Sequence, residues 1–86
     1  MEIEIGERYI RADGIIVIII ETIKIGDYCY MDNMKTTYTR TGTYCYDGIS
    51  YRDLICEVVP SIYALYKGGI IDLKELIKQH IEYYTK

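Results

Sequence analysis

The first half of the chain alternates short runs of β-branched and aromatic residues with pairs of residues that favour turns. The turn pairs are Asp13-Gly14, Gly26-Asp27, Asp32-Asn33, Thr41-Gly42 and Asp47-Gly48. Glycine, asparagine and aspartate tolerate the backbone conformations that tight hairpins require, so this spacing predicts a meander of antiparallel strands. The predicted strands are residues 2–11, 15–24, 28–31, 34–40 and 43–46.

Two of these strands carry a clear burial pattern. Residues 2–5 alternate glutamate with isoleucine, which indicates one solvated face. The run from Ile15 to Ile20 contains only β-branched residues, which is typical of a central strand covered on both sides. Because short twisted strands joined by tight turns tend to curl, we expect an SH3-like, partly open barrel.

After Gly48 the hydrophobic pattern changes to the period of a helix. Ser50 is placed to cap a first helix, and Pro60 is expected to break or kink the chain before a second segment over residues 61–67. Whether residues 50–67 form one kinked helix or two stays open. The apolar positions of the first helix are Tyr51, Leu54, Ile55, Val58 and Val59.

The last helix has the clearest signal. Asp72 and Glu75 form a start that resembles a capping box, and a helix over residues 73–84 is predicted. Its apolar stripe consists of Leu73, Leu76, Ile77, Ile81 and Tyr84. The chain is therefore predicted to be a single α+β domain over residues 1–86. Its β-meander covers residues 1–48, and its helical part, with two or three short helices, covers residues 49–86.

Composition and charge narrow the choice of partner and compartment. The chain has 86 residues, of which 50% are hydrophobic, so one hydrophobic core is expected. A formal net charge of -3 gives no long-range attraction for phosphates, which argues against nucleic acid as a partner. An odd number of cysteines, an opening Met-Glu-Ile-Glu without basic residues and no apolar run of membrane-spanning length indicate a host-cell cytoplasm and no membrane contact.

Few residues suit catalysis or metal binding. The single histidine, His80, falls beside the apolar stripe of the last helix, where a structural imidazole is favoured over a catalytic one. Cys29, Cys45 and Cys56 could complete a zinc site with it, but their isolated spacing favours buried small side chains. No nucleotide-binding or hydrolase motif occurs. We therefore expect no enzymatic activity, no metal and no cofactor.

A small internal repeat carries the functional prediction. Residues 27–32 and 43–47 both contain Tyr-Cys-Tyr beside an aspartate, and the chain has eleven tyrosines but no phenylalanine or tryptophan. Because side chains alternate across a strand, inward cysteines would place the tyrosines on the outer face. We call this predicted binding site the tyrosine surface. Its members are Tyr28, Tyr30, Tyr38, Tyr44, Tyr46, Asp27, Asp32, Asp47 and Arg40.

Three interpretations of the tyrosine surface stay open. The helices could cover it, which would make the rings part of the core. It could bind a protein, since tyrosine is enriched in interface hot spots. It could also stack nucleobases in a nucleic-acid or nucleotide-binding barrel, with Lys35, Arg40 and Arg52 meeting phosphates.

The segment Ile5-Gly-Glu-Arg-Tyr-Ile-Arg-Ala-Asp-Gly-Ile-Ile-Val-Ile resembles the first hairpin of small SH3-like barrel proteins of phages and other mobile elements. This resemblance implies architecture alone. The chain as a whole is similar in size and composition to phage-encoded inhibitors, including anti-CRISPR and other anti-defence proteins. That similarity implies an inhibitor that binds a host defence complex or nuclease and blocks it by occupancy. A further alternative is an accessory subunit that forms a homodimer through its last helix.

Overall fold

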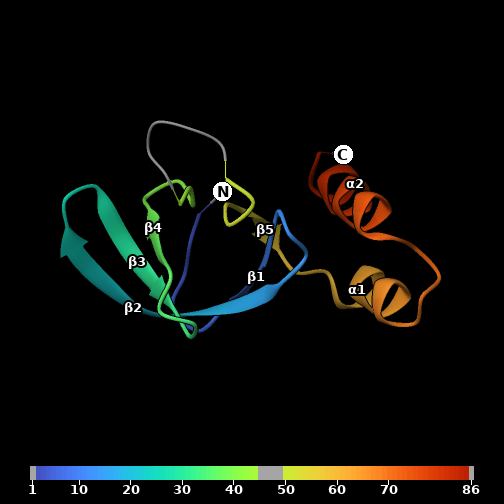
Figure 1. The fold of residues 1–86 in the computed structure, drawn as a ribbon, viewed down its shortest axis with the longest axis horizontal. Coiled ribbons are helices and arrows are strands. Elements are labelled where there is room, and N and C mark those ends of the chain that lie inside the picture. Colours follow the sequence, from blue (N-terminus) through green and yellow to red (C-terminus); the bar gives the residue numbers. More distant parts are fainter. Residues whose placement is uncertain (1, 45–49, 86) are drawn as a thin grey trace.

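The computed structural model describes residues 2–44 and 50–85, and it consists of an antiparallel sheet followed by two helices (Figure 1). The strands are β1 (Arg8–Arg11), β2 (Ile16–Ile25), β3 (Tyr28–Asp32), β4 (Thr37–Thr39) and β5 (Leu54–Glu57). The helices are α1 (Pro60–Lys67) and α2 (Leu73–Tyr84). The order in the sheet is β4-β3-β2-β1-β5, and the strands do not close into a barrel. The predicted α+β class is confirmed.

Strand β2 is the central strand of the sheet, as its long β-branched sequence predicts. Its first part pairs with β1, and from Ile19 onward it pairs with β3, with irregular register between Ile19 and Glu21. Strand β1 is shorter than predicted. Gly6 adopts a φ of 90° in a turn before it, and the Gly6 amide donates to the Ile19 carbonyl at 2.7 Å. Regular pairing with β2 therefore begins only at Arg8.

The predicted helix over residues 50–59 is wrong, because residues 54–57 form β5 at the edge of the sheet. Strand β5 pairs antiparallel with β1, and Ile10 lies opposite Cys56. Apolar residues at positions 54, 55, 58 and 59 fit a helix face, but β-branched Ile55, Val58 and Val59 favour an extended chain. The open edge of β1 decides between the two, because it offers backbone partners that the sequence pattern does not reveal.

The fifth strand that the sequence predicts at residues 43–46 is also not found in the part of the chain that can be described. Thr43 and Tyr44 lie outside any strand, and residues 45 and 46 are beyond the described ranges. Ser50 does not cap a helix. Its hydroxyl oxygen accepts a hydrogen bond from the Arg52 amide at 3.1 Å, which makes a local turn.

The two helices begin where local chemistry favours a start. Pro60 opens α1 at its first turn, where no backbone donor is needed, rather than breaking a longer helix. Helix α2 covers residues 73–84 as predicted, and the Asp72 carboxylate accepts a hydrogen bond from the Glu75 amide at 2.9 Å. The turn between β1 and β2 fits closely against this helix. A Cβ added to Gly14, which has a φ of 85°, would lie 2.5 Å from Leu73 Cδ1.

The hydrophobic side chains form two cores on opposite faces of β1 and β5. The first core contains Ile3, Tyr9, Val17, Ile19, Tyr38 and Leu54. The second contains Ile10, Cys56 and Leu76, packed with half-buried Ile16, Ile55, Ile62, Tyr63, Tyr66, Ile71 and Ile77. Because side chains alternate along a strand, neighbours such as Tyr9 and Ile10 enter different cores. The helices therefore cover the face of the sheet opposite the first core.

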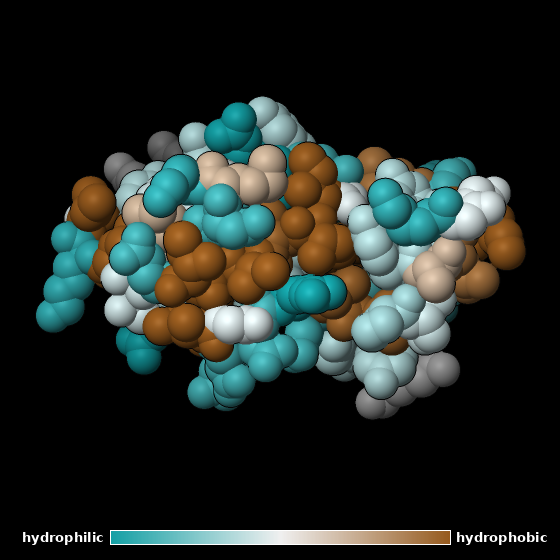
Figure 2. All heavy atoms as spheres, turned by 90° about the horizontal axis from the view of Figure 1, so that it is seen from below, coloured by the Kyte–Doolittle hydropathy of each residue, from teal (hydrophilic) through white to brown (hydrophobic). Residues whose placement is uncertain are grey.

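The helices cover only one end of the sheet. Figure 1 places α1 and α2 beside β1 and β5, while the β2–β3 hairpin extends away at the other end. Along β2, Ile16 packs in the second core, Ile18 is half-buried, and Ile20 is 42% exposed. Apolar surface accordingly gathers beneath the strands in Figure 2, whereas the helical end carries a mixed surface.

Candidate functional site

The structure does not bring the nine residues of the tyrosine surface together. Tyr38 and Asp32 are fully buried, so their prediction as members of an exposed surface is wrong. The Tyr38 hydroxyl donates to one oxygen of Asp32 at 2.7 Å. The other oxygen accepts the amides of Met34 at 2.8 Å and Thr36 at 2.9 Å. Burial raises the pKa of Tyr38 well above its ordinary value, and the hydrogen bond to Asp32 raises it further.

Tyr38 is buried because the face of β3 and β4 that carries it turns inward. Tyr30 lies opposite Tyr38 in the register, so the two tyrosines are paired as the alternation predicts. Their shared face is the inner one, because Tyr30 packs against the first core. Cys29 is only half-buried and belongs to neither core. A tyrosine ring buries far more apolar area than a thiol, so the packing of the rings determines which face is inside.

The remaining members of the tyrosine surface are scattered. Asp27 is exposed at the β2–β3 turn, and Tyr28 beside it is half-buried. Arg40 is exposed and lines a hollow of about 470 Å³ with Glu2, Ile3, Tyr30 and Thr41. Tyr46 and Asp47 lie outside the described residues. Tyr44 belongs to a compact group of side chains.

That group is the Tyr44–Arg52–Tyr51 cluster. The Arg52 guanidinium lies over both aromatic rings, with its carbon 5.2 Å from the Tyr44 ring centre and 5.5 Å from the Tyr51 ring centre. Its Nη1 also donates to the Tyr44 hydroxyl at 3.5 Å. Hydrogen bonding to Tyr51, followed by the charge interaction with the same residue, raises the pKa of Arg52. Tyr51 is 62% exposed, so the cluster presents an aromatic ring to solvent.

Asp53 fixes the backbone beneath this cluster. One carboxylate oxygen accepts the Tyr44 amide at 2.7 Å, and the other accepts the Ser50 amide at 3.0 Å. The Asp53 carboxylate therefore connects the backbone just before residues 45–49, at Tyr44, with the backbone just after them, at Ser50.

The turn between β1 and β2 also forms backbone hydrogen bonds with residues 51 and 53. The Ala12 amide donates to the Asp53 carbonyl at 2.9 Å, and the Asp13 amide donates to the Tyr51 carbonyl at 3.0 Å. The sequence interpretation assigned Tyr51 to the apolar face of a helix and Arg52 to its polar face, and it named Arg52 as a phosphate contact. Ser50 and Asp53 are turn-forming residues, and their spacing is the signal that could have indicated a loop here.

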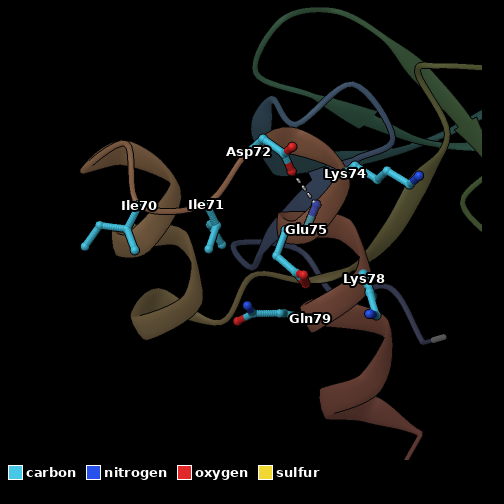
Figure 3. A pocket seen from close by; sticks show the side chains of 7 residues that line it. All are labelled: Ile70, Ile71, Asp72, Lys74, Glu75, Lys78 and Gln79. Carbon is cyan, nitrogen blue, oxygen red and sulfur yellow. Dashed lines mark hydrogen bonds between the residues drawn. The ribbon is translucent and has the colours of Figure 1, made fainter.

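A groove with a volume of about 550 Å³ lies at the N-terminal part of α2. Figure 3 shows Ile71 and Gln79 on the side toward α1, with Lys74 and Lys78 on the opposite side of the helix and Glu75 between them. The groove is lined by Ile70, Ile71, Asp72, Lys74, Glu75, Lys78 and Gln79. Both signs of charge alternate along this wall, and the Asp72 carboxylate caps the helix. The groove therefore has no consistent charge that would select a ligand.

The groups most often used in catalysis are occupied by structural contacts. His80 is fully buried, its Nε2 accepts the Val59 amide at 3.0 Å, and its Nδ1 lies 2.9 Å from the Leu76 carbonyl, to which it donates. Burial, followed by the charge of Glu57, raises the pKa of the Cys56 thiol to about 11, so at neutral pH it stays protonated. Within residues 2–44 and 50–85 no cluster of three acidic, histidine or cysteine residues is arranged to hold a metal ion.

Glu57, at the end of β5, and Glu7, just before β1, form a close pair of carboxyl groups. Hydrogen bonding to Glu7 raises the pKa of Glu57 above its usual value of 4.5, and desolvation and the charges of Glu7 and Glu4 raise it further. The raised pKa means that the folded protein binds this proton more tightly than the unfolded chain does. The resulting stabilisation is complete below pH 4.5 and is lost as the pH rises through the folded-state pKa.

We therefore expect Glu57→Gln to raise the unfolding temperature at neutral pH and to weaken its dependence on pH. The amide cannot ionise, so the repulsion from Glu7 disappears. Thermal unfolding at mildly acidic and at neutral pH measures the effect. Glu21→Gln, at an exposed position of β2, is the matched control and should leave the pH dependence as it is in the wild type. Equal pH dependence in the Glu57→Gln variant and the wild type would contradict the pairing.

Neither of the helices described, α1 with eight residues or α2 with twelve, has the length and hydrophobicity needed to cross a membrane. Comparison of the chain with protein-family models, with curated proteins and with solved structures finds no match. The arrangement of side chains is therefore the basis for assigning a function.

Proposed function

We propose that this chain is a small non-enzymatic protein-binding module that uses the Tyr44–Arg52–Tyr51 cluster to occupy a site on a partner protein. The observation that carries the proposal is the Arg52 guanidinium held over two tyrosine rings, one of which is 62% exposed. Tyrosine and arginine are the residues most enriched, with tryptophan, among those that dominate binding energy at protein interfaces. An exposed group of this composition favours a binding surface over a purely structural contact.

Preorganisation supports the same proposal. Binding costs free energy when flexible side chains must be ordered, so surfaces that are fixed in advance bind more tightly. Asp53 fixes the backbone on both sides of the cluster, and the contact of Arg52 with both rings restricts its long side chain. The cluster therefore has less conformational entropy to lose than an ordinary surface arginine.

The strand order supports an SH3-like arrangement as part of this proposal. A long β2 pairs first with β1 and then with β3, and β5 returns to the free edge of β1. Such a curved sheet carries loops that bind other molecules in many unrelated proteins, so the fold alone does not choose the partner. The resemblance to phage-encoded anti-defence inhibitors makes a host defence complex or nuclease, in the host cytoplasm, the first class of partner to test.

The proposal is tested by capture of partners from host-cell lysate on the tagged protein, with and without nuclease. We expect a nuclease-resistant protein partner whose capture falls by about tenfold or more in Tyr51→Ala and in Arg52→Ala, as is typical of hot-spot residues. Tyr83→Ala is the matched control. Tyr83 is an exposed tyrosine, at 56%, but it lies on α2 against the Tyr84 ring.

Two outcomes would contradict the proposal. Unchanged capture by the folded Tyr51→Ala and Arg52→Ala variants would remove the cluster from the binding site. Loss of every partner after nuclease treatment would favour the alternative of a nucleic-acid-binding barrel in which the same rings stack bases. A steep decrease of affinity with salt concentration would accompany that second outcome.

A further inference from the structure

The Arg52 guanidinium of the Tyr44–Arg52–Tyr51 cluster forms no ion pair with a carboxylate of residues 2–44 or 50–85. Arginine has five N–H donors in a planar fork, and the guanidinium carbon of Arg52 lies over the Tyr44 and Tyr51 rings, 5.2 and 5.5 Å from their centres. Its hydrogen bond to the Tyr44 hydroxyl, at 3.5 Å, is long, and Tyr51 is its other hydrogen-bond partner. In the described part of the chain the side-chain ion pairs join Arg11 to Asp13 and Lys78 to Glu82, and none involves Arg52. Some N–H donors of Arg52 therefore remain available to a ligand.

The absence of an ion pair is notable because a carboxylate is next to Arg52 in the sequence. Both oxygens of Asp53 accept backbone amides, so that carboxylate is committed to holding the loop. Asp13, whose amide donates to the Tyr51 carbonyl, uses its carboxylate on the guanidinium of buried Arg11. Of the carboxylates in residues 2–44 and 50–85, the two that this hydrogen-bond network brings to the loop, Asp13 and Asp53, are therefore engaged by other groups.

We propose that Arg52 binds a carboxylate of the partner protein, an aspartate or glutamate side chain, while Tyr51 packs against the apolar part of the same segment. This inference rests on the proposed function and specifies the chemistry of its binding site. A guanidinium fork binds a carboxylate through two parallel hydrogen bonds, and such charge-assisted pairs are the strong ones in interfaces. The contacts with the two rings restrict the Arg52 side chain before the partner arrives.

A single carboxylate fits the cluster better than a nucleic-acid backbone does. Affinity for nucleic acid comes from several cations that neutralise successive phosphates, and it grows with their number. The cluster contains one cation, and the whole chain carries a net charge of -3. A chain of phosphates would be repelled by the rest of the surface, whereas one acidic side chain from a protein would meet only Arg52.

The test uses the intact protein with two short peptides as probes, acetyl-Leu-Glu-Leu-amide and its glutamine counterpart acetyl-Leu-Gln-Leu-amide. The side-chain Nε–H signal of Arg52 is followed by NMR during titration. We expect the glutamate peptide to shift this signal with an affinity in about the millimolar range and the glutamine peptide to bind about tenfold more weakly. Arg52→Gln, followed through backbone signals of the loop, should lose the preference for glutamate. The exposed Arg40→Gln is the matched control and should keep it.

Equal binding of the two peptides, no shift with either, or tighter binding of a short oligothymidine would overturn the inference. The capture experiment separates this failure from that of the proposed function. If Tyr51→Ala loses the partner but Arg52→Gln retains it, the binding surface stands and the carboxylate inference falls. If both variants retain the partner, the proposed function falls, and the peptide titration alone decides whether Arg52 binds carboxylates.

Discussion

Replacement of Asp32 by alanine is expected to lower the free energy of unfolding by about 3 kcal/mol or more, because each buried donor left without an acceptor costs about 1–3 kcal/mol. Asp32 is fully buried and accepts hydrogen bonds from the Met34 and Thr36 amides and from the Tyr38 hydroxyl. Alanine removes all three acceptor contacts at once. Chemical denaturation of the purified variant measures the loss.

Asp27→Ala is the control for this experiment, because Asp27 is an exposed aspartate in the preceding hairpin turn. Its expected effect is within about 0.5 kcal/mol, as for most surface substitutions. Tyr38→Phe separates the contributions, since it removes one donor and leaves the two backbone amides in place. A loss below about 1 kcal/mol for Asp32→Ala would mean that water replaces the carboxylate and that the turn is not buried in solution.

The second large effect is expected at His80, where alanine should lower the free energy of unfolding by about 2–4 kcal/mol through lost packing and an unpaired amide. The imidazole joins α2 to the link between β5 and α1, because its Nε2 accepts the Val59 amide and its Nδ1 donates to the Leu76 carbonyl. Denaturation gives the stability, and hydrogen exchange of the Val59 amide reports the specific contact. That amide should exchange faster in the variant.

Gln79→Ala is the neighbouring control on the same helix, at a half-buried position that lines the surface groove. It should change stability by less than about 1 kcal/mol. The folded fraction of His80→Ala should bind the captured partner as the wild type does, because His80 is fully buried. A variant with wild-type stability but altered binding would contradict the structural role.

The elements with a complete local signal could be predicted from the sequence. Helix α2 has a capping aspartate, a 3.6-residue period and no competing pairing, and its predicted bounds agree with the structure. The long β2 likewise follows from the β-branched run of residues 15–20 and the alternating residues after it. In both segments the local preference and the tertiary environment favour the same conformation.

Residues 54–59 could not be predicted because their decisive partner is distant in sequence. Their apolar spacing suits a helix and a strand about equally, and the free edge of β1, more than forty residues earlier, selects the strand. The position of the binding site failed for a related reason. Period-two alternation correctly groups Tyr30 with Tyr38 but does not say which face the first core will cover.

The actual cluster depends on contacts that no local pattern encodes. Arg52 meets Tyr44 across residues 45–49 because Asp53 binds both sides of that segment. Sequence analysis could identify Tyr44 as a candidate, since it belongs to the repeated Tyr-Cys-Tyr motif. It could not pair Tyr44 with Arg52 without knowing that residues 50–53 form a turn.

Strands β1 and β5 contribute side chains to both hydrophobic cores, so the two cores share the same two strands. Tyr9 and Ile10, adjacent in the chain, are both fully buried, so both faces of β1 are covered at these two positions. The helices are consequently part of the packing of the sheet. Removal of α2 would expose the apolar face that carries Ile10 and would favour aggregation. New chain ends for a circular permutant are best placed at the tip of the β2–β3 hairpin, because neither core contains a residue from this turn.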